Sequence, residues 1–286
     1  MKLCRYGRIG KEQPGLIGPD GELRDLSGLI ADLTPDQLAG DKLAVLAKLD
    51  PRSLPLVEGR PRLGAPVRDI PKFIAIGLNY LDHAEEAGLA IPTEPIIFLK
   101  ATSCISGPND DIVEPLDSTK LDWEVELGII IGTQARNVLE AEALDYVAGY
   151  CVVNDVSERA FQFQSSQWDK GKGCDSFGPV GPWLVTKDEV IDPQNLDLWL
   201  DVNGKRMQTG NTSKMIFSVR QIISYCSRYM TLQPGDVIIT GTPPGVGMGI
   251  KPVPVWLKPS DIVQLGITGL GSQRQRIVAT EVSVHD

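Results

Sequence analysis

Hydrophobic residues along the chain form short runs of the length expected for β-strands. From residue 72 onward these runs are separated by turn residues, and they read FIAIGL, IIFLK, WEVELGIIIG, YVAGYCVVND, WLVT, LDLWLDVNG, DVIITG and DIVQLGIT. Helices are expected at 80–87, 140–146 and 215–229. Because long strands with few intervening helices disfavour a doubly wound sheet, the pattern predicts an α+β fold built on a mixed β-roll or sandwich.

The first part of the chain has a different pattern. Short strand-like segments, MKLCRY, PGLIG and GELRDL, are followed by leucines at helical spacing between Pro35 and Leu49. The next segment, DPRSLPLVEGRPRLGAPVRDIP, is rich in Pro and Arg, as connections between domains often are. The sequence therefore predicts a small N-terminal domain at 1–69 and a second domain at 70–286.

Two acidic residues interrupt the apolar run WEVELGIIIG. Successive side chains of a strand point to opposite faces, so Glu124 and Glu126 share one face, roughly 7 Å apart. Ile130 falls on the same face, which indicates that this face is covered too. Buried carboxylates need a cation between them. Asp155, at the end of the run YVAGYCVVND, could complete a three-carboxylate metal site; the alternative is a solvent-facing strand with Asp155 capping a turn.

Composition narrows the kind of metal and partner. The 286 residues are 42% hydrophobic and 23% charged, as in soluble globular proteins, and a formal net charge of -9 disfavours nucleic acid as a partner. Because the histidines are only His83 and His285, the ligands would be mostly oxygen, which points to Mg²⁺ or Mn²⁺ rather than Zn²⁺. The five cysteines show no C-x-x-C spacing. Without a long apolar run or a signal-peptide core, we expect a cytoplasmic protein with no membrane partner.

Three further stretches carry candidate chemistry. In GLNYLDHAEEAG, His83 and Glu86 lie three residues apart on the expected helix, so the carboxylate could orient the imidazole as a water-activating base; a surface ion pair is the alternative. QWDKGKGCDSFGPVGP offers Lys170 or Lys172 among glycines, and a flexible loop is equally compatible with it. DVIITGTPPGVGMG lacks the ending of a phosphate loop, so nucleotide binding is not expected. Thr242 and its neighbouring amides could bind a carboxylate, and a structural turn explains the glycines equally well.

Together, and in this order along the chain, the four stretches resemble the fumarylacetoacetate hydrolase family over roughly residues 70–270. The resemblance implies the C-terminal mixed β-roll of that family, a bound Mg²⁺ or Mn²⁺ ion, and a homodimer or homotetramer. The residues that it implies are metal ligands at Glu124, Glu126 and Asp155, catalytic residues at His83, Glu86 and Lys172, and substrate-binding residues at Gln162, Arg159 and Thr242.

The stretches ISGPNDDI, WDKGKGC and TPPGVGMG are similar to bacterial members that are often labelled ureidoglycolate lyase. Several of those look like hydrolases of 2,4-diketo-3-deoxy sugar acids. The resemblance thus implies a hydrolase of C–C bonds in a small-molecule 2,4-diketo acid, with the L-rhamnonate or L-fuconate derivative giving pyruvate and lactate. Leu78 departs from the pattern, because relatives that cleave short acylpyruvates often have Arg or Lys there.

Two other functions remain open from the sequence. Decarboxylation of oxaloacetate, or hydration or isomerisation of a related keto acid, would use the same metal-stabilised enolate and differ in what leaves or adds. A catalytically inert protein that binds metal and keto acid is the alternative from another class. Survival of activity in His83→Ala would favour the decarboxylase, since that reaction needs no water-activating base.

Overall fold

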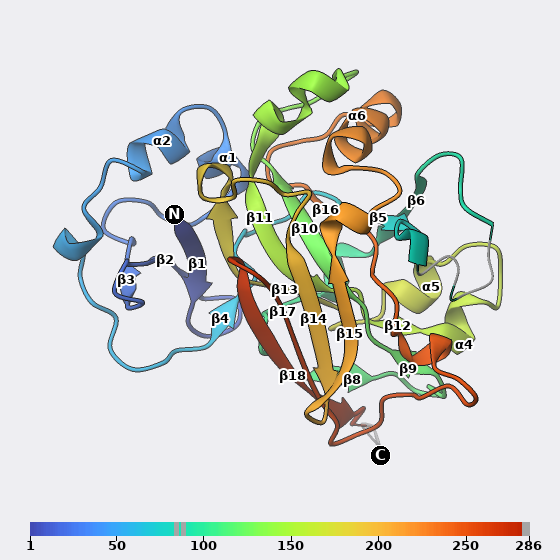
Figure 1. Ribbon diagram of the computed structural model, residues 1–286. Coiled ribbons are helices and arrows are strands. Elements are labelled where there is room, and N and C mark those ends of the chain that lie inside the picture. The colour runs from blue at the N-terminus through green and yellow to red at the C-terminus, as the bar shows by residue number, and fades with distance from the viewer. Residues whose placement is uncertain (83–85, 87–89, 282–286) are drawn as a thin grey trace, which may run out of the picture.

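The computed structural model describes residues 1–82, 86 and 90–281, and Figure 1 shows that two β-sheets dominate it. The main sheet contains, in spatial order, β3 (Leu23–Asp25), β2 (Gln13–Ile17), β1 (Lys2–Tyr6), β13 (Gly178–Thr186), β11 (Val147–Asn154), β10 (Val125–Ile131), β16 (Val237–Ile239), β5 (Phe73–Gly77) and β6 (Ile96–Lys100), with β4 (Leu63–Gly64) against β1 and β7 (Ile105–Ser106) against β13. The predicted α+β fold with mixed sheets is confirmed.

The second sheet packs across β10, β11 and β13 of the main sheet (Figure 1). It contains β15 (Lys205–Asn211), β14 (Asp197–Val202), β17 (Ile262–Ile267), β18 (Gly271–Ala279) and β8 (Ile112–Glu114), and a small separate ladder pairs β12 (Ser157–Glu158) with β9 (Leu121–Asp122). Strand β10 is buried along its whole length, so both of its faces are covered. Its apolar face, with Val125, Leu127 and Ile129, belongs to the hydrophobic core.

Helices are short and lie at the ends and edges of the sheets. The α-helices are α1 (Pro35–Leu38), α2 (Lys42–Leu46), α4 (Arg159–Gln162), α5 (Asp169–Lys172) and α6 (Val219–Tyr229), and the 3-10 helices are η1 (Pro51–Ser53), η2 (Thr102–Cys104), η3 (Glu140–Tyr146), η4 (Lys187–Glu189), η5 (Thr212–Lys214) and η6 (Gly247–Gly249). In the described part of the chain, these helices are too short or too polar to cross a membrane.

The expected helices differ from the observed ones in three places. The leucine-rich segment forms α1 and α2 rather than one helix, because the chain turns at Gly40, where φ is +61°. Residues 140–146 form the 3-10 helix η3, and the helix expected at 215–229 begins at Val219, where Ser218 and Gln221 form a capping box. The helix expected at 80–87 lies largely outside the described residues.

The N-terminal strands are continuous with the main sheet. Strand β1 pairs with β2 and β4 on the N-terminal side, and it also pairs with β13, with Leu3 opposite Leu184. In Figure 1 this blue part of the chain lies to one side of the sheets, opposite α4 and α5. The expected boundary near residue 70 falls between β4 and β5, and strands from both sides of it share one sheet.

The register of four strands brings distant segments to one end of the main sheet. Strands β10 and β11 are antiparallel, and Val125 lies opposite Asn154. Strand β16 runs antiparallel to β10 and parallel to β5. The start of β10 therefore lies beside the ends of β11, β16 and β5, and the polar residues that follow those strands meet there.

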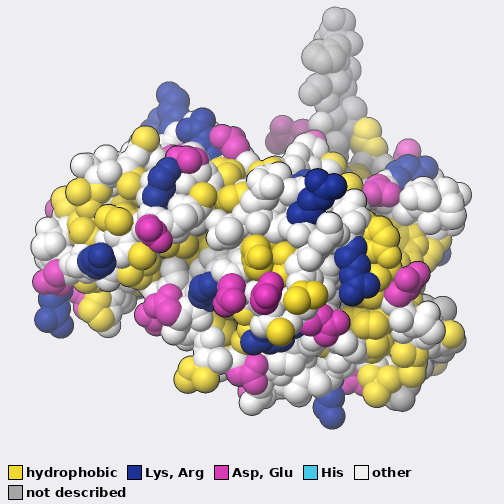
Figure 2. All heavy atoms as spheres, turned by 90° about the horizontal axis from the view of Figure 1, so that it is seen from above, with side chains coloured by type: hydrophobic (Ala, Val, Ile, Leu, Met, Phe, Trp, Pro, Cys, Tyr) yellow, Lys and Arg dark blue, Asp and Glu magenta, His cyan; other side chains and the backbone are white. Residues whose placement is uncertain are grey.

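Figure 2 shows acidic and basic side chains intermixed over the face that it displays, so this face is not dominated by one sign of charge.

Candidate metal centre

Three carboxylates converge at this end of the sheet. Glu124 directly precedes β10, Glu126 lies within it, and Asp155 follows β11. One oxygen of each carboxylate lies within 4.8 Å of the others, and the three residues are at most 6% exposed. The backbone N–H of Asp155 donates to the carbonyl oxygen of Glu124 at 2.9 Å, which fixes the two residues side by side. The structure thus brings together the three acids that the sequence proposed as metal ligands.

Cations contact two of the three carboxylates. The ammonium of Lys172 lies 2.7 Å from Glu124 Oε2 and 2.7 Å from Asp155 Oδ2. Arg159 Nη2 lies 2.5 Å from Glu124 Oε1. Burial by itself would raise the pKa of Glu124, but Lys172 and Arg159 bring that pKa well below its usual range. Glu124 is therefore an anion at neutral pH.

Glu126 has a different environment from Glu124. The backbone N–H of Gly241 donates to its Oε2 at 2.7 Å, and Glu126 forms no ion pair with any described residue. Burial, together with the negative charges of Asp155 and Glu124, raises the pKa of Glu126 well above its usual range. A cation bound among the three acids would offset the repulsion between their charges and stabilise the ionised form of Glu126, so the donor set fits a divalent metal ion.

The Gly241 turn has a local cause in the sequence. Gly241 has φ of +90°, and a Cβ there would lie 2.8 Å from the Cβ of Asn79. Asn79 is fully buried, and its side chain bonds the backbone of Phe217 and of Thr240. Strand β5 and the segment after β16 are thus held in contact, and this contact directs the Gly241 N–H at Glu126.

The residues proposed for substrate binding line the same cavity. Arg159 also bonds Asp122, with Nε 2.8 Å from Oδ2, and its Nη1 donates to Gln162 Oε1 at 2.9 Å. The hydroxyl of Thr242 donates to the carbonyl oxygen of Val125 at 2.9 Å. Arg159, Gln162 and Thr242 are therefore fixed in position by the protein itself.

The proposed His–Glu pair is only partly visible. His83 lies outside the described residues, as does His285. The carboxylate of Glu86 accepts the backbone N–H of Gly245, with both oxygens at 3.2 Å. Glu86 is thereby tied to the glycine-rich segment that also carries Thr242, close to the carboxylate cluster.

Sequence reasoning missed two members of the charge network. The ammonium of Lys100 is fully buried and lies 2.5 Å from Asp155 Oδ1, and it also donates to the carbonyl oxygen of Lys172. Asp122 is buried beside Arg159 and accepts the backbone N–H groups of Gly247 and Met248. A charged residue ending the apolar run IIFLK was the only signal for Lys100, because its partners lie far away in the sequence.

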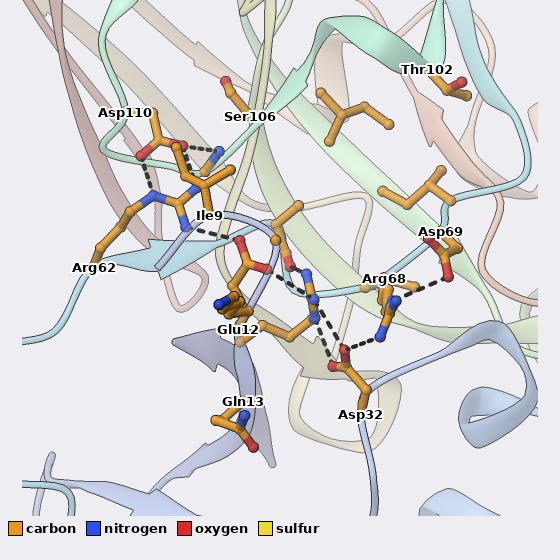
Figure 3. A pocket seen from close by; sticks show the side chains of 18 of the residues that line it. Ile9, Glu12, Gln13, Asp32, Arg62, Arg68, Asp69, Thr102, Ser106 and Asp110 are labelled. Carbon is orange, nitrogen blue, oxygen red and sulfur yellow. Dashed lines mark hydrogen bonds and ion pairs between the residues drawn. The ribbon is translucent and has the colours of Figure 1, made fainter. Parts of the chain in front are cut away.

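A larger cavity, of about 850 Å³, lies between the N-terminal part of the chain and residues 102–110, and Figure 3 shows it from close by. Arg5 Nε lies 2.7 Å from Asp32 Oδ1. Arg62 Nη2 lies 2.6 Å from Asp110 Oδ2, and Arg62 Nη1 lies 3.0 Å from Glu12 Oε1. Within the described residues, the only group of three possible metal ligands is the Glu124, Glu126 and Asp155 cluster. We therefore place the candidate chemistry in the smaller cavity, of about 80 Å³, that this cluster lines.

Comparison with known proteins gives a family. The model of the Fumarylacetoacetate (FAA) hydrolase C-terminal family matches residues 72–278. A protein from Burkholderia multivorans that is provisionally named a hydrolase is 63% identical over 276 residues, which are 96% of this chain and 98% of the relative.

Solved structures similar to this one include two enzymes of different named activity. Maleylpyruvate hydrolase from Sphingobium sp. SYK-6, in complex with manganese(II) and pyruvate, is 30% identical with a TM-score of 0.79, over 98% of this chain and 100% of that one. 2-Hydroxyhepta-2,4-diene-1,7-dioate isomerase from Mycobacterium marinum is 33% identical with a TM-score of 0.70, over 99% and 100%. The two names describe different reactions, and they do not point specifically to the expected sugar-acid hydrolases or to ureidoglycolate lyase.

Proposed function

The chain belongs to the fumarylacetoacetate hydrolase family, and from this premise we propose that it hydrolyses a C–C bond in 2,4-diketo acids with a bound Mg²⁺ or Mn²⁺ ion. The named substrates that we favour are 2,4-diketo-3-deoxy-L-rhamnonate and its L-fuconate counterpart, which would give pyruvate and lactate. The observation that carries the proposal is a buried three-carboxylate cluster in which Glu126 has no cation of its own among the described residues. The manganese and pyruvate in the similar hydrolase support the metal and the product.

Glu124, Glu126 and Asp155 would hold the ion. Carboxylate oxygens suit the hard cations Mg²⁺ and Mn²⁺, and among the described residues the cluster contains neither sulfur nor imidazole, which disfavours zinc. When bound, the ion would act as a Lewis acid that polarises a keto oxygen and stabilises negative charge on the pyruvyl group.

Lys172 supplies a fixed positive charge beside the reacting atoms. Burial by itself would lower the pKa of Lys172, but Asp155 and Glu124 raise it above its ordinary value. Lys172 therefore remains an ammonium at neutral pH, so it is suited to stabilise an oxyanion and not to act as a base or an amine nucleophile. Gln162, held by Arg159, adds an oriented amide on the same wall of the cavity.

The water-activating role falls to the predicted His83, oriented by Glu86. In this reaction a water molecule adds to carbon 4 while the imidazole takes its proton. The bond between carbons 3 and 4 then breaks, and its electron pair remains with the pyruvyl fragment as an enolate. Protonation of carbon 3 gives pyruvate, and carbon 4 leaves as the carboxylic acid of the second product. Glu86 is tied to Gly245, which would keep the pair beside the cavity.

A pyruvate-release assay over a panel of diketo acids tests the proposal. We expect release that requires Mg²⁺ or Mn²⁺, stops with a chelator, and is lost in His83→Ala while metal binding persists. Full activity in the presence of chelator would show that the metal assignment is wrong. Loss of metal binding and activity together in His83→Ala would show that the roles are misassigned.

Isomerisation of an unsaturated keto acid is the second candidate, and the similar isomerase structure favours it. This reaction adds no water and releases no pyruvate, so product analysis separates it from hydrolysis. Conversion of substrate at constant carbon skeleton, without pyruvate, would replace our proposal with an isomerase. Carbon dioxide release from oxaloacetate that survives in His83→Ala would instead indicate a decarboxylase.

A further inference from the structure

We propose that the cavity at the metal centre selects diketo acids whose acyl tail is uncharged and largely apolar, and excludes tails that end in a second carboxylate. The inference concerns the same site and rests on the proposed function, because it assumes that the pyruvyl end binds at the carboxylate cluster. It assigns specificity to a wall of side chains formed by Leu78, Phe98, Phe163, Trp168 and Met248, which we call the apolar wall.

Burial separates the lining of the cavity into a floor and a wall. The polar lining residues are all buried, and they are Glu124, Glu126, Asp155, Arg159, Gln162, Lys172 and Thr242. Every member of the apolar wall is half-buried or exposed, and Phe163 is 56% exposed. The charged groups are therefore deep, and the apolar wall lies nearer to solvent. A diketo acid whose pyruvyl end reaches the carboxylates would place its tail along this wall.

The apolar wall is held in place by its own packing. The rings of Phe98 and Trp168 meet edge to face, with centroids 5.4 Å apart. Trp168 lies against the backbone of Gly77, where a Cβ would come within 2.5 Å of the indole. Lys172 Nζ lies 5.6 Å from the centroid of the Phe98 ring, so the apolar wall is directly adjacent to the buried polar lining residues, which we call the charged floor. The aromatic surface is thus fixed beside the path of the tail.

The described lining has no cation available for a second carboxylate. Its cations are Arg159 and Lys172, and both are already bonded to acids of the charged floor. A carboxylate placed against the apolar wall would lose hydration without gaining a partner. An alkyl tail would instead bury apolar surface there. The tail of 2,4-diketo-3-deoxy-L-rhamnonate ends in a methyl group, so the favoured substrate satisfies this requirement.

Two diketo acids of nearly equal size, used as substrates of the metal-loaded enzyme, test the inference. In 2,4-dioxoheptanedioate the tail ends in a carboxylate, and in 7-methyl-2,4-dioxooctanoate an isopropyl group replaces it. We expect kcat/KM for pyruvate release to favour the isopropyl compound by roughly 100-fold. Equal rates, or a preference for the dioate, would overturn the inference.

A substitution in the apolar wall provides the second test. Phe163→Arg adds a cation at an exposed position, so we expect it to fold and to raise kcat/KM for the dioate about tenfold while lowering it for the isopropyl compound. Phe163→Leu is the matched control, and it should retain the wild-type preference because leucine is also apolar. An unchanged preference in Phe163→Arg would show that this wall does not contact the tail.

Calorimetric titration of both acids into the Mn²⁺-loaded protein separates failure of the inference from failure of the proposed function. Selective binding of the isopropyl compound without pyruvate release would support the tail preference and overturn only the hydrolase. Turnover of both compounds with tighter binding of the dioate would overturn only the tail preference. Binding of neither compound would overturn both.

Discussion

At the larger cavity shown in Figure 3, which we call the junction cavity, Glu12, Asp32 and Asp110 each contact an arginine. At the candidate metal centre, in contrast, Glu126 forms no ion pair with a described residue. Both regions are networks of buried or half-buried charges, and both join segments far apart in the sequence. They differ in how completely the negative charges are matched by side-chain cations.

The difference shows which network is structural and which can bind a cation. A matched network satisfies its own charges and can hold chain segments together. Arg5 joins β1 to Asp32 and Glu12 within the N-terminal part of the chain, and Arg62 joins that part to Asp110 (Figure 3). At the metal centre, Glu126 is buried beside two other acids and must be protonated or bind a cation.

The largest effect is expected from Glu126→Ala. Removing the unmatched carboxylate removes one of three oxygen ligands, so we expect kcat for pyruvate release to fall by roughly 10³-fold and Mn²⁺ affinity to fall with it. Steady-state kinetics and Mn²⁺ titration followed by electron paramagnetic resonance measure the two quantities. Glu12→Gln, at the junction cavity, should keep kcat per folded molecule. Full metal-dependent activity in Glu126→Ala would remove the basis for a metal centre here.

Arg5→Met tests the matched network. Arg5 is 8% exposed, and its loss leaves Asp32 buried without its bidentate partner, so we expect the free energy of unfolding to fall by about 3 kcal/mol. Urea unfolding followed by circular dichroism measures the change. Arg68→Met removes an exposed arginine that also contacts Asp32, and it should cost less than about 1 kcal/mol. Equal stability of the two variants would contradict the structural role of the network.

Lys172→Met tests whether the ammonium of Lys172 contributes to catalysis. Removing one preorganised group that stabilises an oxyanion is expected to lower kcat by about 100-fold. Mn²⁺ binding should persist, because the removed ammonium contacts two of the proposed ligands and does not itself coordinate metal. Lys170→Met is the matched control, since Lys170 is exposed on the same helix. A kcat in Lys172→Met equal to that of Lys170→Met would assign Lys172 to structure alone.

The smallest effect is expected at Asp236, a buried carboxylate that lines neither cavity and has a partner for only part of its charge. Its Oδ2 lies 2.6 Å from Lys72 Nζ, while its Oδ1 is buried and has no hydrogen-bond partner in the described part of the chain. Burial raises the pKa of Asp236 above its ordinary value of 3.8, although Lys72 acts in the opposite direction. The native state therefore binds this proton more tightly than the unfolded state, and the contribution of Asp236 to stability falls as pH rises from about 3.8 through the native pKa.

Urea unfolding of wild type and Asp236→Asn at several acidic pH values measures this contribution. We expect the stability of wild type relative to the Asn variant to fall as pH rises through that range, because the side chain of the Asn variant does not titrate. Parallel pH profiles for the two proteins would mean that the buried oxygen imposes no cost.

Local patterns were enough to predict the strands that are built from apolar runs, and the separation of polar from apolar faces on them. Alternation in WEVELGIIIG placed Glu124 and Glu126 on one face and Val125 and Leu127 on the other, and β10 is built in that way. The same reasoning did not find β15 or β18. Their sequences, KRMQTGN and GSQRQRIVA, are rich in polar residues, and they become strands by pairing with β14 and β17.

The sequence alone thus determined that acids lie on a covered strand face and that oxygen would dominate any metal site. Only the tertiary structure decided which cations reach those acids, because Arg159 and Asp122 are 37 positions apart, and Lys100 and Asp155 are 55 apart. It also decided that aromatic residues from β6 and from the segment before α5 meet above the charged floor. Periodicity is a property of neighbouring residues, whereas burial and charge matching depend on which distant strands pair.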